Sequence, residues 1–469
     1  MKKIFFSQYK IMIGLLLVAG LSPSCKRLIE IPANPPTAIT EAQQFLDSAT
    51  AMTAVAGCFS YASNGGGSFT FNDGALARNT GLSSDELIYT PTNYPEAQQL
   101  YANNLNAFNG SVTAMWANPY IGLYPVNTTL NGVAISSGLS ASFKKEITAE
   151  LKVVRALYYF YMINIFGGVP YVTSSDYQAA IRVGRTPVDS VYSHILADLT
   201  DARDALPLEY PSEGRVRPNR NVVSAFLSKV YLYRQEWQKA YDAANTVIGS
   251  GEYSLEPDLN NVFLDGSQEA IWQLPANGYS QVTAEAGAFI PYNSSVTPNY
   301  IFTPFLKNAF ESGDQRLQQW AKVTTMNIGG VDQTVYSPYK YKNLYSSAAT
   351  VEDYMIFRLG ELYLIRAEAA AHIGNTSDAL DDLNQVRARA GVPASTASTE
   401  DDLLTAIMHE RQTELFTEWG SRWLDLKRTG TIDAVLSAEK TGWDAHDALY
   451  PVPNTQLNLN SLLKQNPGY

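Results

Sequence analysis

The sequence predicts a mainly α-helical protein, in which tetratricopeptide-like helical hairpins carry long irregular loop insertions and few short strands. Two observations lead to this fold class. Segments with helical periodicity follow one another in pairs, and two of those pairs echo each other: residues 240–247 (AYDAANTV) and 379–386 (ALDDLNQV) are identical at four of eight positions. Small residues where one helix crosses its mate, with apolar residues on the opposite stripe, are typical of stacked helical hairpins.

The first pair of helices is expected at about 143–166 and 188–206. The second of these begins with Thr186 and Pro187, a capping pattern typical of a helix start, and keeps apolar residues at helical spacing up to the next proline. The segment before it becomes apolar on every side from Val153 onward and stops at two glycines, as a buried helix does. We expect these two helices to pack antiparallel.

The echoing pairs are expected at about 222–233 with 238–248, and at about 359–373 with 377–390, where Gly391 ends the last helix. The two copies lie far more than one tetratricopeptide period of about 34 residues apart, so the hairpins form a scaffold that carries long insertions rather than a uniform solenoid. No proline- or serine-rich linker, charge block or low-complexity stretch divides residues 25–469. We therefore expect one domain.

The N-terminal residues have the pattern of an export signal. A basic lead of three lysines precedes the apolar run 11–19, which is too short to span a bilayer. The run ends in Leu21-Ser22-Pro23-Ser24-Cys25, which resembles a bacterial lipobox. The sequence therefore predicts a lipoprotein signal peptide at residues 1–24 and lipidation of Cys25; the alternative is an ordinary secretory signal with a chance cysteine. No later segment reaches the length of a membrane span, so this lipid is the expected membrane attachment.

Composition excludes some classes of protein. The chain has 34 Lys and Arg against 45 Asp and Glu, a net charge of −11, and three of the lysines fall in the signal peptide. A nucleic-acid partner is therefore not expected. Beyond Cys25 the only cysteine is Cys58, which cannot form an internal disulfide and is expected to be a small buried residue.

Two stretches with weak helical period are rich in aromatic residues. Residues 59–124 contain eleven aromatics and nine asparagines, and residues 277–345 contain a second group of aromatics: Tyr279, Phe289, Tyr292, Tyr300, Trp320, Tyr336, Tyr339, Tyr341 and Tyr345. Aromatic rings offer flat apolar faces, while Asn, Gln and Asp offer hydrogen-bonding edges. This combination suits a sugar, although peptides satisfy the same chemistry and many of the rings are expected to fill the insertions' own small cores.

Catalytic motifs are missing from the sequence. The four histidines lie far apart, and there is no zinc helix, nucleophile elbow, phosphate loop or calcium loop. We therefore expect no cofactor and no metal. Hydrolysis of glycosides needs only two facing carboxylates, so a hydrolase remains an open alternative, and Asp85-Glu86 is the tempting acidic pair.

Four ordered blocks resemble the SusD/RagB family of outer-membrane nutrient-binding lipoproteins. They are RALYYF into FGGVP (155–170), FRLGELYLIRAEA (357–369), ER and EL into RWLDLKRTG (410–430), and YPVP through Asn460 to QNPGY (450–469). The resemblance implies a SusD-like fold. It also implies that Glu414, Arg422 and Asp425 in these blocks hold the scaffold together rather than contact a ligand.

The resemblance further implies a function, that of a binding protein and not an enzyme. Members of this family sit on the outer membrane facing outward, act as a lid on a SusC-like TonB-dependent transporter, and capture oligosaccharide for import. A peptide-binding lid of the same kind of transporter is the alternative, and a glycoside hydrolase is the third. From the two aromatic insertions we expect the following ligand contacts: Arg78, Tyr94, Tyr101, Asn103, Tyr279, Tyr292 and Trp320.

Overall fold

The computed structural model describes residues 40–64, 74–276, 282–293, 296–344 and 350–469. The predicted signal peptide and Cys25 lie outside them. The helices of this part are α2 (Glu41–Gln44), α3 (Ser48–Asn64), α4 (Leu76–Ser83), α5 (Pro95–Ala102), α6 (Gly110–Ile135), α7 (Ala141–Phe166), α8 (Tyr177–Ala180), α9 (Val188–Ala205), α10 (Arg220–Tyr233), α11 (Trp237–Ile248), α12 (Ala284–Phe289), α13 (Pro304–Ala309), α14 (Gln315–Gln319), α15 (Leu359–His372), α16 (Thr376–Ala390), α17 (Glu400–Glu414), α18 (Ser421–Arg428), α19 (Ile432–Glu439) and α20 (Asn454–Leu459).

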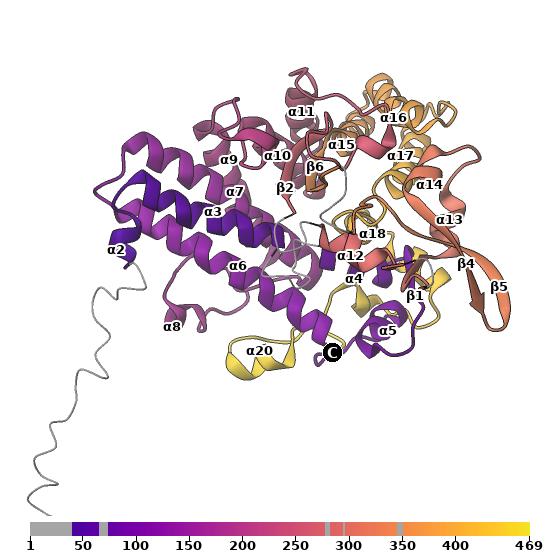
Figure 1. The fold of residues 1–469 in the computed structure, drawn as a ribbon, viewed down its shortest axis with the longest axis horizontal. Coiled ribbons are helices and arrows are strands. Elements are labelled where there is room, and N and C mark those ends of the chain that lie inside the picture. The colour runs from indigo at the N-terminus through magenta and orange to yellow at the C-terminus, as the bar shows by residue number, and fades with distance from the viewer. Residues whose placement is uncertain (1–39, 65–73, 277–281, 294–295, 345–349) are drawn as a thin grey trace, which may run out of the picture.

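The strands of the described residues form three two-stranded antiparallel sheets. They pair β1 (Leu87–Tyr89) with β3 (Tyr300–Phe302), β2 (Ala270–Pro275) with β6 (Asp353–Arg358), and β4 (Ala321–Ile328) with β5 (Val331–Pro338). Figure 1 shows that helices make up most of the molecule. The predicted mainly α fold with few short strands is therefore confirmed. None of the described helices combines the length and the apolar character needed to cross a membrane.

The first predicted helix pair is present as α7 and α9. The Thr186 N–H donates to the Val169 carbonyl at 2.9 Å, which brings the end of α7 beside the start of α9, so the helices run antiparallel as expected. Arg155 of α7 binds Asp198 of α9 at 2.8 Å and fastens the pair further along. Thr186 does not cap α9 through its side chain, because the chain is still extended there and pairs with Val169.

The two echoing hairpins stack against each other, although they are far apart in the sequence. Helices α10, α11, α15 and α16 form successive layers, in which α11 contacts α15 (Figure 1). Arg366 of α15 binds Asp382 of α16 at 2.7 Å and Asn245 of α11 at 2.6 Å. The chain therefore leaves the stack after α11, makes a long excursion, and returns to continue the same stack at α15.

The first insertion is shorter than the predicted 59–124, because both of its ends are helical. Helix α3 continues to Asn64 and α6 already begins at Gly110. Pro119 and Pro125 lie inside α6 and interrupt the pattern by which a helix is recognised in a sequence. Gly122 lets α6 approach α7 closely, since a Cβ at this position would overlap the Tyr158 hydroxyl.

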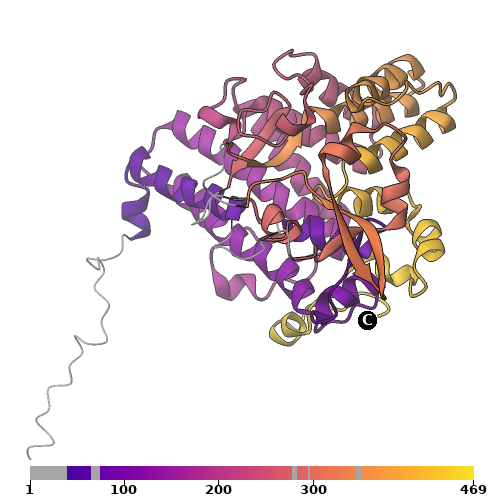
Figure 2. The same ribbon diagram turned by 45° about the vertical axis from the view of Figure 1, so that its right-hand side comes forward.

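Two of the small sheets hold the insertions in place. Strands β2 and β6 pair Ala270 with Arg358 and so join the two ends of the second insertion near its exit from the stack. Strands β1 and β3 pair Leu87 with Phe302 and Tyr89 with Tyr300, and so join the first insertion to the second. The longer β4–β5 hairpin lies at the right-hand edge of the molecule in Figure 1 and in front of it in Figure 2.

Acidic residues of the predicted framework blocks form buried ion pairs with arginines. Glu414 is fully buried and contacts Arg316 at 3.1 Å as well as Arg358 and Arg389. Asp425 binds Arg411 at 2.7 Å. The prediction that these residues hold the scaffold is confirmed.

Asp85 and Glu86 belong to the same framework. Arg422 donates to both carboxylate oxygens of Asp85, with its Nε 2.8 Å from Oδ1, and the Thr417 N–H donates to Glu86 at 3.1 Å. Both acids are about 1% exposed. Since neither carboxylate reaches a surface, the pair fixes the link between α4 and β1 and is not placed for catalysis.

Cys58 is a small core residue, as predicted. It is 1% exposed, its Sγ lies 3.7 Å from the Thr129 hydroxyl, and burial raises the pKa of the thiol to about 11. Two of the histidines pack against aromatic rings, as expected for structural residues: His194 stacks on Tyr171 and His372 on Trp237.

The stack of hairpins should tolerate little extra volume at its crossing points. Ala379 of α16 is fully buried, so Ala379→Leu should overpack the contact and reduce the free energy of unfolding by about 1–3 kcal/mol, measured by urea denaturation. Ala388 lies exposed on the same helix, and Ala388→Leu should leave stability close to that of the wild type. Equal effects of the two substitutions would contradict the proposed packing.

Glu86 should make stability depend on pH. Burial, reinforced by the nearby Asp85 carboxylate, raises the pKa of Glu86 from 4.5 to about 8. The stability that Glu86 contributes is therefore fully present below its unfolded pKa of 4.5, falls as the pH rises above that value, and is lost once the pH has passed about 8. Relative to the wild type, Glu86→Gln should gain stability between about pH 5 and pH 8.5, measured by thermal unfolding across this range. A stability difference that stays constant with pH would show that Glu86 is ionised in the fold.

Candidate functional site

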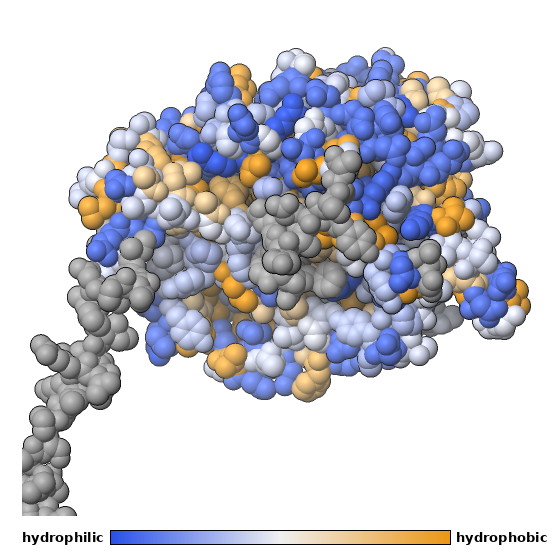
Figure 3. All heavy atoms as spheres, in the orientation of Figure 1, coloured by the Kyte–Doolittle hydropathy of each residue, from blue (hydrophilic) through white to orange (hydrophobic). Residues whose placement is uncertain are grey.

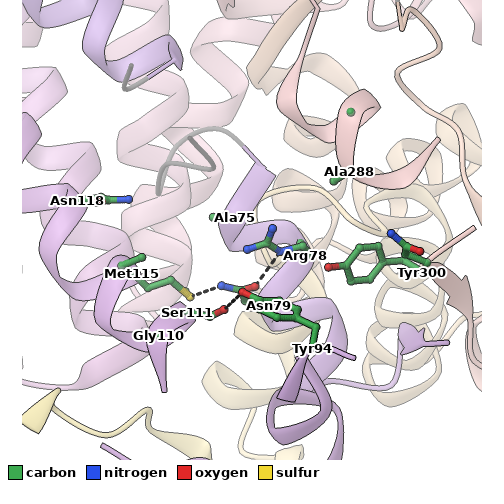
Figure 4. Close-up of a pocket in the computed structure, with 13 residues that line it drawn as sticks. Ala75, Arg78, Asn79, Tyr94, Gly110, Ser111, Met115, Asn118, Ala288 and Tyr300 are labelled. Atoms are coloured by element: carbon green, nitrogen blue, oxygen red, sulfur yellow. Dashed lines mark hydrogen bonds between the residues drawn. The ribbon is translucent and has the colours of Figure 1, made fainter. Parts of the chain in front are cut away.

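The two insertions meet α6 around a cavity of about 400 Å³, which we call the tyrosine cavity (Figure 4). Its walls come from α4, the loop before α5, the first turns of α6, and the segment from α12 to β3. Its floor and sides include small or apolar residues such as Ala75, Ala114 and Met115. The polar residues that line it are Arg78, Asn79, Tyr94, Ser111, Asn118, Asn299 and Tyr300.

Arg78 and Tyr300 face each other across the cavity, from α4 and β3 respectively (Figure 4). The Arg78 Nε donates to the Asn79 Oδ1 at 3.0 Å, and the Asn79 amide donates to the Met115 sulfur at 3.0 Å, so the guanidinium is oriented by its neighbours. Burial raises the pKa of Tyr300 to about 12, although the Arg78 charge acts to lower it. The Tyr300 hydroxyl therefore keeps its proton at neutral pH and remains able to donate.

Tyr94 closes another side of the cavity and is held by contacts on both ends. Its hydroxyl lies 3.0 Å from the Ser111 hydroxyl at the start of α6. Its ring packs edge-on against Tyr89, with the centroids 6.0 Å apart, and Tyr89 in turn packs against Tyr300 at 5.2 Å. Because Tyr89 and Tyr300 are also paired across β1 and β3, the three rings form one supported unit.

The chemistry of the tyrosine cavity is that of rings and neutral hydrogen-bonding groups. The half-buried Tyr94 offers ring surface, and Tyr300, which is 5% exposed, directs its hydroxyl toward Arg78 (Figure 4). Hydroxyl and amide groups surround them, so that a ligand with C–H faces and many hydroxyls finds both kinds of contact. Arg78 is the one charged residue among the described residues that line it, and no carboxylate is among them. No cluster of potential metal ligands is found among the described residues.

The structure separates the residues predicted as ligand contacts. Arg78 and Tyr94 line the tyrosine cavity. Tyr101 and Asn103 line a different hollow, between the end of α5 and the segment after α19. Tyr292 is 68% exposed but does not line the tyrosine cavity, and Tyr279 lies outside the described residues.

The prediction for Trp320 is wrong. Its side chain is fully buried, its Nε1 donates to the Leu259 carbonyl at 2.9 Å, and the Lys340 ammonium lies 4.7 Å from its ring centroid. Trp320 therefore packs the second insertion onto the scaffold, because its ring lies against Phe263 and Phe416, which are outside the insertion. The ring has no face left for a ligand.

Sequence reasoning missed Tyr300, Asn79, Ser111 and Asn118 as cavity residues. Tyr300 was counted among the aromatics of the second insertion, and Asn79 and Asn118 among the asparagines of the first. What the sequence could not show is the β1–β3 pairing, which brings Tyr300 from over 200 residues away to face Arg78.

The sequence matches two protein-family models and is similar to several known proteins. Residues 233–469 match a model described as the SusD family, and residues 78–232 match one described as starch-binding, associating with outer membrane. SusD-like protein P2 of Formosa agariphila is 28% identical over 417 residues, covering 77% of this chain and 81% of that protein. The starch-binding protein SusD of Bacteroides thetaiotaomicron is 24% identical over 415 residues, covering 68% and 72%.

Solved structures share the architecture. A SusD superfamily protein of Bacteroides vulgatus superimposes with a TM-score of 0.78 at 18% identity, covering 91% of this chain and 100% of the other. A laminarin-binding SusD-like protein superimposes with a TM-score of 0.73 at 23% identity, covering 90% and 100%. The expected SusD-like fold is confirmed, and the family model extends over half of the sequence. This chain belongs to the SusD family.

Proposed function

We propose that this protein is a cell-surface glycan-binding lipoprotein that captures oligosaccharide in the tyrosine cavity and delivers it to a SusC-like TonB-dependent transporter in the outer membrane. The observation that carries the proposal is the lining of the cavity, in which Tyr94 and Tyr300 stand among amide and hydroxyl groups. A sugar ring stacks its C–H face on an aromatic ring and shares hydrogen bonds with groups at the edge.

The relatives support the same class of ligand. One is named a starch-binding protein and one solved neighbour a laminarin-binding protein. Both names refer to glucose polymers, and the described walls of the cavity, with one guanidinium and no carboxylate, suit an uncharged polyol better than a peptide with its termini and charges. A peptide ligand remains the second outcome of the binding test.

The residues that line the tyrosine cavity do not support glycosidase activity. The reaction needs two carboxylates that flank the scissile bond, and the described residues that line the cavity include none. Asp85 and Glu86, the acidic pair that follows α4 in the sequence, are buried in contacts with Arg422 and Thr417. We infer binding without turnover.

Removing the Tyr94 ring should weaken glycan binding. In affinity gels that contain laminarin, starch or other polysaccharides, Tyr94→Ala should reduce retention by roughly tenfold or more, because the ring forms one wall of the cavity. Tyr94→Phe keeps the ring and loses only the contact with Ser111, so it should retain most of the binding. Tyr101→Ala is the matched control, since this half-buried tyrosine lines a separate hollow.

Three outcomes of this experiment would overturn parts of the proposal. Equal loss in Tyr94→Ala and Tyr101→Ala would place the ligand elsewhere. Retention of peptides but not of any polysaccharide would favour the peptide-binding alternative. Release of reducing ends from a bound glycan would identify an enzyme.

Membrane attachment should depend on Cys25. The lipobox-like sequence that ends at Cys25 provides the proposed anchor, and no described helix offers another. Cys25→Ala should therefore move the protein from the membrane fraction to the soluble fraction of lysed cells, or leave it unprocessed. In wild-type cells, added protease should degrade the protein from outside. A Cys25→Ala variant that is processed and still sediments with membranes would rule out the lipid anchor.

A further inference from the structure

A second hollow of about 500 Å³ lies further along α6 and is not needed for the site described above. We call it the α6 groove: it runs between α6, the segment 170–181 that includes α8, and α20. Figure 1 shows α8 and α20 on the same side of α6, and Figure 3 shows hydrophobic residues among hydrophilic ones along the edge where α20 lies. Its walls are mostly apolar, with hydroxyl and amide groups at intervals.

Two tyrosines of the α6 groove present their rings to solvent. Tyr124 of α6 is 57% exposed and Tyr177 of α8 is 64% exposed, whereas Trp116 beneath them is buried. Exposed apolar surface that is gathered in a groove, rather than scattered singly, is typical of a binding site. Two rings from different elements therefore meet in one groove, and both are more exposed than Tyr300 of the tyrosine cavity, which is 5% exposed.

Asn127 provides an independent sign of a ligand in this groove. The residue lines the groove and is 1% exposed, and its Nδ2 donates to the Val172 carbonyl at 2.9 Å. Its Oδ1 is buried and accepts no hydrogen bond from the part of the chain that the structure describes. A buried acceptor without a donor is unfavourable by about 1–3 kcal/mol, and a ligand hydroxyl would satisfy it.

The α6 groove and the tyrosine cavity adjoin along one edge of α6, while their other lining residues, Ser111 and Asn118 in the cavity and Tyr120 and Asn127 in the groove, lie on opposite sides of the helix. Gly110 and Ala114 line the cavity, Ala117 and Tyr124 line the groove, and these positions follow each other, through Ile121, at alternating steps of four and three residues. Residues at this spacing share one face of an α-helix. Along the helix axis the two hollows overlap, since Asn118 lines the cavity and Ala117 the groove. From Ser111 to Tyr124 the axis rises by about 20 Å, at 1.5 Å per residue, so the two hollows together are longer than a single sugar ring.

We propose that the α6 groove is a second carbohydrate subsite, which binds the distal rings of a glycan whose near end occupies the tyrosine cavity. This inference rests on the proposed function and adds the length of the ligand. An extended oligosaccharide crosses the edge of α6 that separates the two hollows, over the small side chains of Ala114 and Ala117. Tyr124 and Tyr177 stack on its rings, and the Asn127 Oδ1 accepts a hydroxyl hydrogen.

The test is the dependence of affinity on ligand length. The probes are oligosaccharides, graded from disaccharide to octasaccharide, of the polysaccharide that the wild type retains in the affinity gels, with the laminari- and malto-series tested first by titration calorimetry of the full chain. Affinity should rise with length. Tyr124→Ala and Tyr177→Ala should each weaken the longest probe by roughly five- to tenfold and leave the disaccharide unchanged.

Matched variants separate this inference from the proposed function. Tyr124→Phe keeps the ring and should bind long probes like the wild type, and Phe305→Ala removes a ring that is 45% exposed on α13 and lines neither hollow. Tyr94→Ala should weaken short and long probes alike. If affinity does not rise with length, or if Tyr124→Ala and Tyr177→Ala bind long probes normally, the groove is not a subsite although the tyrosine cavity still binds. If no polysaccharide is retained at all, both proposals fail.

Discussion

A buried cluster of charges around Glu414 connects the hairpin scaffold to the second insertion. Carboxylates and cations are present in equal number, five of each, and they come from six separate segments of the chain: Glu269, Asp314, Glu410, Glu414 and Glu418 with Arg316, Lys340, Arg358, Arg387 and Arg389. Charges removed from water are tolerated only when each is paired and hydrogen-bonded. Because any displacement of one segment would leave several buried charges without partners, the cluster fixes how the insertion sits on the repeats.

The same constraint reaches the tyrosine cavity through a short turn. Glu414 ends α17, and the turn that follows it holds Thr417 and Trp419 at positive φ angles of 52° and 50°, a conformation that non-glycine residues adopt only when their surroundings impose it. The Thr417 N–H donates to Glu86, whose neighbour Leu87 begins β1. Strand β1 carries Tyr89, and β3, paired to it, carries Tyr300. The cavity is therefore built on elements that the buried charges hold in place, which favours a preformed site.

The helical pairs could be predicted from the sequence because their signals are local. Apolar spacing, a pair of glycines after α7 and Gly391 after α16 gave the helix positions to within a few residues, and Ala240 and Ala379 are buried as the echo indicated. Helix α6 was missed because Pro119 and Pro125 lie inside it. Trp320 and Tyr94 have the same kind of sequence context, yet one fills a core and the other lines a cavity. That difference depends on which segments fold over each ring, and a pairing such as β1 with β3 leaves no local pattern.

The distribution of charge separates the scaffold from the proposed binding surface. Buried arginines and carboxylates are paired with one another inside the framework, whereas the described residues that line the tyrosine cavity and the α6 groove include a single charged group, Arg78. Uncharged groups lose less free energy than charged groups when a ligand displaces their water, and a neutral glycan brings no opposite charge with which a charged group could pair. Affinity must then come from rings and from many weak hydrogen bonds spread along the ligand. Such contacts add up only when several sugar units are held at once, and α6 offers the length for this by carrying one hollow near its start and another that adjoins it and extends further along the helix.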